Sequence, residues 1–199
     1  LCPMSVFLQK WAPLIALVVV MTTYLHTQFE MVFKCPSCHL FVDSADGLKN
    51  YFTSAYFVKH DDFGLWSQGM NYPYGEHVVY TDNQPVISMI MKAVDRVIAM
   101  DTHIIGTINM LMIISLILAA ICLYYVMRSF GLPRWYAAIL GIPIALLSPQ
   151  IARFNGHYSL AYAFYIPLFL LLLIRWVKDD SGLARGALLT GWIAFMGFT

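Results

Sequence analysis

The amino-acid sequence places one long polar segment between apolar runs, and this arrangement constrains the fold more than any other feature. An apolar run ends near Leu25, and another begins near Ile104. Acids, histidines and aromatic residues are frequent between them, whereas the chain beyond Ile104 is apolar with short polar connections. The pattern predicts an all-α, polytopic transmembrane helix bundle with its chemistry on the long first loop, residues 29–103.

The composition also favours a membrane protein. Hydrophobic residues make up 60% of the chain, charged residues 12%, and the mean hydropathy is +0.68. A helix of about 20 apolar residues crosses a bilayer. The sequence predicts spans at 11–28, 104–128, 136–149, 159–177 and, cut short, 186–199. Because the chain starts with Leu1 and the last span is cut short, we expect residues 1–199 to be the amino-terminal part of a longer transmembrane domain, inactive on its own.

Lys and Arg in the short connections predict the orientation of the spans. They fall on one side if the spans alternate: Lys10, Arg128, Arg134, Arg175, Lys178 and Arg185. Because positive charge marks the cytoplasmic side, we expect a multi-pass protein of the bacterial cytoplasmic membrane with its amino terminus inside and the long loop outside. The net charge is only +1 and there is no basic patch, which argues against nucleic acid as a partner.

The long loop contains several predicted elements. Apolar residues at helical spacing predict a helix over 46–60, and a second, amphipathic helix over 85–100 is typical of a membrane interface. Glycines and a proline make 69–75 a turn-rich segment, which a short extended piece at 77–80 follows. The third span ends in a polar, irregular segment at 148–157, which at membrane depth requires protein or water beside it.

The acid pair Asp43 and Asp46 is the first candidate site, at the predicted start of the 46–60 helix. A carboxylate just outside the membrane can take a proton from an acceptor hydroxyl or hold a divalent metal ion. The same residues also suit an ordinary helix start, because Asp caps helices and acids are favoured in the first turn. From the residues alone, both interpretations stay open.

Two further sets of polar residues could bind a substrate. Cationic and amide side chains suit a lipid phosphate: Arg153, Asn155 and His157, with Lys49, His60 and His77 from the loop. Alternatively, Arg153 only extends to the headgroups. Glu76, Asp82 and Asn83 lie near Tyr74 and Tyr80 and suit a sugar, since rings stack on pyranose faces while acids and amides bind hydroxyls. The alternative is a polar loop with packed tyrosines.

The segment Cys35-Pro36-Ser37-Cys38-His39 matches the C-x-x-C-H pattern by which c-type haem is attached. A haem site needs a packed apolar pocket, whereas this segment follows the first span directly and has no compact domain of its own. We therefore favour a disulfide or a dithiol of Cys35 and Cys38 over free thiols, and both over haem. A zinc site would need His39 and His60 as further ligands, and that spacing matches no common zinc finger.

Several stretches resemble the GT-C class of membrane glycosyltransferases, and in particular a large, poorly characterised bacterial group within it. They are Asp46-Gly47-Leu48-Lys49-Asn50-Tyr51, Met70-Asn71-Tyr72-Pro73-Tyr74-Gly75-Glu76-His77, Tyr80-Thr81-Asp82-Asn83-Gln84-Pro85, and Ser148-Pro149 followed by Arg153 and Gly156-His157. The resemblance covers nearly the whole chain.

The resemblance implies a polyprenyl-phosphate-linked sugar as donor and the lipid bilayer as a partner. It further implies a catalytic acid at Asp46, with Asp43 second, and a lipid phosphate at Arg153 and His157. Many members carry a second acid on the next outer loop, but Pro149–Tyr158 contains none. The chain therefore departs from the pattern expected for a bound divalent metal, which stays open as a cofactor.

The leading hypothesis is a glycosyltransferase acting at the outer face of the cytoplasmic membrane. One alternative is a membrane-anchored thiol or c-type haem redox protein that uses Cys35, Cys38 and His39. Another is a transporter or lipid-handling protein without covalent chemistry. The redox hypothesis predicts loss of function when Cys35 is replaced, whereas the glycosyltransferase hypothesis predicts loss when Asp46 is replaced.

Overall fold

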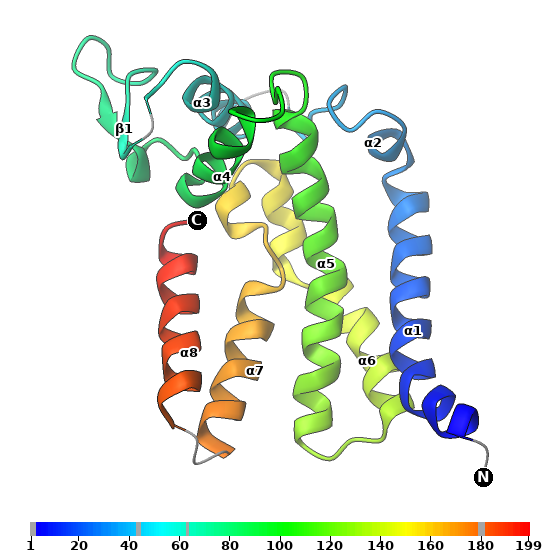
Figure 1. The fold of residues 1–199 in the computed structure, drawn as a ribbon. Coiled ribbons are helices and arrows are strands. Elements are labelled where there is room, and N and C mark those ends of the chain that lie inside the picture. The colour runs from blue at the N-terminus through cyan, green and yellow to red at the C-terminus, as the bar shows by residue number, and fades with distance from the viewer. Residues whose placement is uncertain (1–2, 43–44, 63, 179–181) are drawn as a thin grey trace. The chain divides into compact units, whose positions relative to one another are not determined.

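The computed structural model describes residues 3–42, 45–62, 64–178 and 182–199. Helices dominate these residues, so the all-α prediction is confirmed, with a single hairpin of two-residue strands in addition. The chain divides into two compact units (Figure 1). Unit one contains Leu1–Glu30, Ile113–Ile151 and Ala163–Ile193, and unit two contains Met31–Met112, Ala152–Tyr162 and Ala194–Thr199.

Unit one is built from long apolar helices. It holds α1 (Pro3–Gln28), most of α5 (Ile104–Ser129), α6 (Arg134–Leu146), α7 (Tyr165–Lys178) and most of α8 (Gly182–Gly197). Helix α1 packs on α6, where Gly141 allows close approach. A Cβ at Gly141 would lie 3.1 Å from Ala120 O of α5 and 3.4 Å from Leu17 Cδ1 of α1, so a larger residue would push α6 away from both helices.

Two helical stretches in the described part of the chain are long and apolar enough to cross a membrane. They are Ile104–Ser129 and Arg134–Asn155. The second joins α6 to the 3₁₀ helix η2 (Pro149–Asn155). By length and composition these two stretches agree with a membrane-associated protein.

Unit two contains the long polar loop. Its elements are α2 (Glu30–Lys34), α3 (Ala45–Lys59), β1 (Trp66–Ser67), β2 (Glu76–His77), η1 (Val78–Tyr80), α4 (Pro85–Asp95), the first turns of α5, and η3 (Tyr158–Leu160). Helices α3 and α4 pack on each other (Figure 1). Lys92 Nζ donates to Phe57 O at 3.0 Å and to Val58 O at 3.1 Å, so a side chain of α4 satisfies the last carbonyls of α3.

Helix bounds in the loop follow the sequence pattern in part. The helix predicted at 46–60 is found as α3, Ala45–Lys59. The helix predicted at 85–100 ends earlier, at Asp95, because Asp95 Oδ1 accepts a hydrogen bond from Met100 N at 2.7 Å and the chain turns there. The extended piece predicted at 77–80 is wrong beyond His77, where a 3₁₀ turn follows. The span predicted from 159 becomes an α-helix only at Tyr165, since a 3₁₀ turn lies ahead of it.

Candidate functional site at the start of helix α3

Asp46 lies in the first turn of α3 and its side chain is exposed to solvent. The amino end of a helix carries partial positive charge, which favours an ionised carboxylate there. Its predicted companion Asp43 lies outside the described residues. The position of Asp46 therefore fits both interpretations of the sequence, a reactive carboxylate and a helix start, and its surroundings must distinguish them.

A buried amide connects the start of α3 to the segment after η2. Asn50 is 2% exposed, and its Nδ2 donates to Asp46 O at 2.7 Å and to Gly156 O at 2.8 Å. Gly156 has a φ of +150°, and a Cβ there would lie 3.6 Å from Asp46 Cβ and 3.5 Å from Gly47 N. Glycine at 156 thus permits a backbone conformation and a close approach that fix the 153–158 segment against Asp46.

Two tyrosines pack beneath this contact. The rings of Tyr51 and Tyr158 meet edge to face with centroids 4.8 Å apart, and both side chains are buried. Burial raises the pKa of both phenols, so both stay neutral at ordinary pH. A Cβ on Gly47 would lie 3.2 Å from the Tyr158 hydroxyl, so there is no room for a side chain at residue 47. The tyrosines support the start of α3 from its buried side.

Lys49, one turn beyond Asp46, pairs with one acid and is influenced by the charge of two more. Its Nζ lies 2.9 Å from Asp82 Oδ2, and both side chains are partly exposed. The hydrogen bond to Asp82 raises the pKa of Lys49, and the charges of Asp82, Asp46 and Glu76 act in the same direction against the opposing effect of burial. Three sequence-predicted residues, Lys49, Glu76 and Asp82, therefore belong to one electrostatic group with Asp46.

The backbone around Asp82 adopts an unusual conformation. Asp82 and Gln84 have φ values of +59° and +54°, a region that residues other than glycine seldom adopt. Asn83 between them is fully buried, and its carbonyl accepts hydrogen bonds from the hydroxyls of Ser54 and Ser88. Asn83 thus holds residues 82–84 against α3 and α4. Asp82, next to it, is exposed and pairs with Lys49.

Arg153 and His157 lie on the two sides of Gly156, and both are exposed. Arg153 O accepts hydrogen bonds from Gly156 N at 3.1 Å and His157 N at 3.0 Å, so the segment is a tight turn. Because Gly156 contacts the backbone next to Asp46, the turn brings both sequence-predicted phosphate-binding residues to the same end of α3 as the acids. Across the described residues, no group of three or more His, Cys, Asp or Glu side chains is arranged to hold a metal ion.

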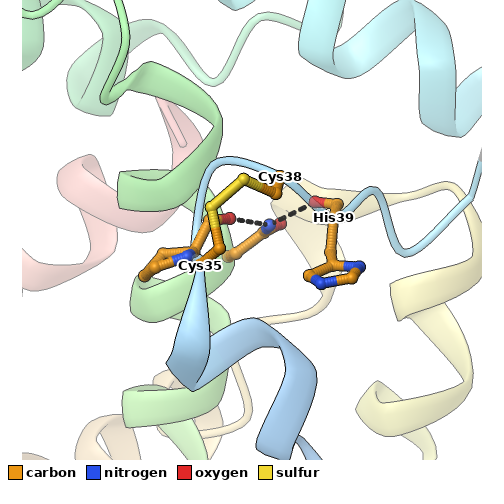
Figure 2. The surroundings of a disulfide bond; sticks show 5 residues. Cys35, Cys38 and His39 are labelled. Carbon is orange, nitrogen blue, oxygen red and sulfur yellow. Dashed lines mark hydrogen bonds between the residues drawn. A yellow bond between two sulfur atoms is a disulfide. The ribbon is translucent and has the colours of Figure 1, made fainter.

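The Cys35-Pro36-Ser37-Cys38 turn contains a disulfide between Cys35 and Cys38, with Cα atoms 5.3 Å apart (Figure 2). Asn109 of α5 holds this turn: its Nδ2 donates to Pro36 O at 2.8 Å and to His39 O at 2.7 Å, as the dashed lines of Figure 2 mark. The Asn109 Oδ1 in turn accepts the hydroxyl of Tyr51. The disulfide turn is thereby connected to the tyrosines under the start of α3.

Sequence reasoning missed Asn109, and it named Asn50, Tyr51 and Gly156 only within stretches that resemble a family, without a role of their own. One signal was available, because Asn109 is the only amide residue in the apolar run Ile104–Ser129. A buried amide in such a run requires hydrogen-bonding partners, which the disulfide turn and Tyr51 supply. The other three act through contacts with residues distant in the sequence.

Unit one contains a separate apolar cavity of about 470 Å³. Its lining comes from α5, α6, the segment after α6 and α7: Ala119, Leu123, Ile144, Ala145, Leu147, Ser148, Pro149, Gln150, Ala163, Ile166 and Pro167. Its size is that of a ligand cavity, and its aliphatic walls suit a hydrocarbon chain.

Comparison with curated proteins gives no match, and comparison with solved structures gives none either. A protein-family model matches residues 13–199, which include all of unit two, unit one from residue 13 onward, and every candidate site residue. The model carries the description "Domain of unknown function (DUF6311)". The chain therefore belongs to the DUF6311 family.

Proposed function

We propose that the protein is a membrane glycosyltransferase that transfers a sugar from a polyprenyl-phosphate donor at the outer face of the bacterial cytoplasmic membrane. The observation that supports this most is the exposed carboxylate of Asp46, which lies at the same end of α3 as the turn that carries Arg153 and His157. Such an arrangement provides a base for a hydroxyl and, at Arg153, positive charge for a phosphate.

In this mechanism Asp46 accepts the proton of an acceptor hydroxyl, whose oxygen forms a bond to the anomeric carbon of the donor sugar. The bond from that carbon to the phosphate oxygen breaks, and polyprenyl phosphate leaves with the electron pair. Arg153 and His157, both exposed, balance the charge on the phosphate. Lys49 holds Asp82 at 2.9 Å and keeps the segment after β2 beside α3. The protein mainly positions reactants, because phosphate is already a good leaving group.

The lipid part of the donor requires an apolar site. The cavity of about 470 Å³ in unit one has room for a segment of an isoprenoid chain. Under this proposal, Ile104–Ser129 and Arg134–Asn155 cross the membrane together with α1, α7 and α8. The amino terminus is cytoplasmic and residues 29–103 are extracytoplasmic, as the Lys and Arg distribution predicts.

The test is sugar transfer in membranes that carry the full-length protein, supplied with a radiolabelled polyprenyl-phosphate sugar. We expect transfer that depends on the protein, is lost in Asp46→Asn and is retained in Asp101→Asn. Asp101 is a matched control because it is an exposed acid of the same loop. Transfer that is absent from wild-type membranes, or equal in the two variants at equal protein levels, would contradict the proposal.

A thiol redox protein is the second candidate, because the C-x-x-C segment contains a disulfide and Cys38 is exposed to solvent. Disulfide exchange begins with attack of an external thiolate on one sulfur, which requires this kind of access. Replacing Cys35 with serine separates the two candidates, since it removes the disulfide and leaves Asp46 and its partners in place.

A further inference from the structure

The β1–β2 hairpin of unit two exposes aromatic rings that the proposed transfer chemistry does not use. Trp66 of β1 is 50% exposed and Tyr80 of η1 is 71% exposed. Figure 1 shows β1 and the loop that follows it on the outside of this unit, away from the packed α3–α4 pair. Large rings left in solvent by an ordered segment are typical of binding surfaces.

Trp66 is held in a fixed orientation. Its Nε1 donates to Tyr74 O at 3.2 Å. The indole lies against Gly75, where an added Cβ would be 2.3 Å from Nε1 and where φ is +71°. Glycine at 75 therefore permits both the turn and the seating of the indole. A ring that is already ordered loses little entropy when a ligand stacks on it.

The register of the hairpin brings further rings to the same side. Trp66 is directly opposite His77 in the antiparallel pair, so both side chains point to one face of the two strands. The His77 ring packs against Tyr80 with centroids 6.2 Å apart. We call Trp66, His77 and Tyr80 the aromatic platform.

The platform adjoins the candidate site through the chain itself. Glu76 precedes His77 in β2 and therefore points to the opposite face, and its charge acts on Lys49. Asp82, two residues beyond Tyr80, binds Lys49 directly. A ligand on the platform would thus lie beside residues that adjoin Glu76 and Asp82 in the chain.

Charge indicates what kind of ligand the platform accepts. The chain between Lys59 and Lys92 contains no Lys or Arg, and it contains Asp61, Asp62, Glu76 and Asp82. Asp61 is buried and accepts hydrogen bonds from Ser67 Oγ and Gln68 N, both at 2.8 Å, whereas the other three acids keep solvent access. Such a surface repels phosphate and anionic lipid, and its carboxylates can accept hydrogen bonds from hydroxyls.

We propose that the aromatic platform binds a pyranose ring of a saccharide, which serves as the acceptor of the transfer reaction. The apolar face of the sugar stacks on Trp66, and hydroxyls donate to the neighbouring carboxylates. The role of this saccharide as acceptor rests on the proposed function, whereas saccharide binding at the platform does not.

The experiment is calorimetric titration of the full-length protein in detergent with maltohexaose, chitotetraose and mannotetraose as probes. We expect at least one probe to bind, and we expect Trp66→Ala and Gly75→Ala to weaken that Kd about tenfold or more, the scale of a lost aromatic contact. Gly75→Ala keeps every ring but displaces the indole, because its Cβ would be 2.3 Å from Trp66 Nε1, and it strains the turn, where φ is +71°. Trp135→Ala is the matched control, since Trp135 is 54% exposed on α6 of the other unit.

The outcomes separate this proposal from the transfer reaction. Binding that survives Asp46→Asn but not Trp66→Ala supports the platform, whether or not transfer is observed. The platform proposal is wrong if no probe binds the wild-type protein, or if Trp66→Ala binds as tightly as Trp135→Ala. It is also wrong if brominated phosphatidylcholine in proteoliposomes quenches wild-type fluorescence and Trp66→Phe reduces the quenched fraction, because the Trp66 ring then lies in the membrane interface.

Discussion

Lys49 Nζ lies 2.9 Å from Asp82 Oδ2, and this contact joins helix α3 to a segment 33 residues further along the chain. It sets the distance between the start of α3, where Asp46 is exposed, and the hairpin that carries the aromatic platform. The charges of Asp46 and Glu76 act on Lys49 in the same direction as this contact.

The Lys49–Asp82 pair predicts a specific dependence of stability on pH. The pKa of Lys49 is raised above 10.5 in the folded protein, mainly by the hydrogen bond to Asp82. The Lys49–Asp82 pair therefore stabilises the fold fully below pH 10.5, and this effect is lost as pH rises through the higher folded-state pKa of Lys49. We expect Lys49→Met to lower the free energy of unfolding by less than about 1 kcal/mol at pH 8, because the pair is partly exposed. The difference should shrink above pH 10.5, the unshifted pKa of the lysine.

Thermal unfolding followed by circular dichroism in detergent, from pH 8 upward, measures this difference. Asp82→Asn provides the control background, since Lys49 has lost its partner there and Lys49→Met should no longer produce a pH-dependent change. A difference that grows with pH would contradict the assignment.

Asn50 should matter for stability more than an exposed asparagine does. Its Nδ2 is bonded to Asp46 O and Gly156 O, so Asn50→Ala leaves two carbonyls in a buried region without this donor. We expect a loss of about 1–3 kcal/mol in the free energy of unfolding. Asn155→Ala, at an exposed position of η2, should change it by less than about 0.5 kcal/mol. Equal melting temperatures for the two variants would show that the Asn50 bonds contribute nothing.

Two glycine substitutions should have opposite signs. Gly156→Ala forces alanine to a φ of +150° beside Asp46, which costs about 1–3 kcal/mol. Gly191 is in the middle of α8, with no atom within 4 Å of an added Cβ, so Gly191→Ala should stabilise the helix by about 0.5–1 kcal/mol. Thermal unfolding of both variants tests the prediction. The Gly156 argument is wrong if both substitutions raise the melting temperature.

The disulfide turn should be supported more by Asn109 than by its sulfur bond. Asn109 donates to Pro36 O and His39 O and accepts from Tyr51, and these contacts do not depend on the state of the cysteines. We expect the double replacement Cys35→Ser and Cys38→Ser to retain sugar transfer, and Asn109→Ala to lower the free energy of unfolding by about 2 kcal/mol or more. Loss of transfer in the serine variant at normal protein levels would favour the thiol redox function.

The helical elements of unit two could be predicted wherever local patterns determine them. Helix α3 has apolar residues at helical spacing, and α4 starts with Pro85 in its first turn, so both were found with correct starting points to within a residue. The end of α4 was missed because a side-chain acceptor at Asp95 competes with the helix, and the pattern of apolar residues continues past it.

The candidate site was predictable only as a list of residues. Asp46, Lys49, Glu76 and Asp82 were each identified, but their grouping depends on contacts such as Lys49–Asp82 that no local pattern encodes. The support from Tyr51 and Asn109 joins residues 58 positions apart, and Gly156 acts through the space it leaves beside Asp46. Such contacts follow from packing between distant segments, so they require the three-dimensional structure.

The proposed mechanism requires Asp46 to act in the transfer step. The most direct measurement is the initial rate of sugar transfer by the full-length protein, across concentrations of the polyprenyl-phosphate sugar, for wild type, Asp46→Asn and Asp46→Glu. We predict a kcat at least about 100-fold lower for Asp46→Asn, with partial recovery in Asp46→Glu, because a general base contributes on that scale. A kcat for Asp46→Asn equal to that of wild type would show that this carboxylate only begins helix α3.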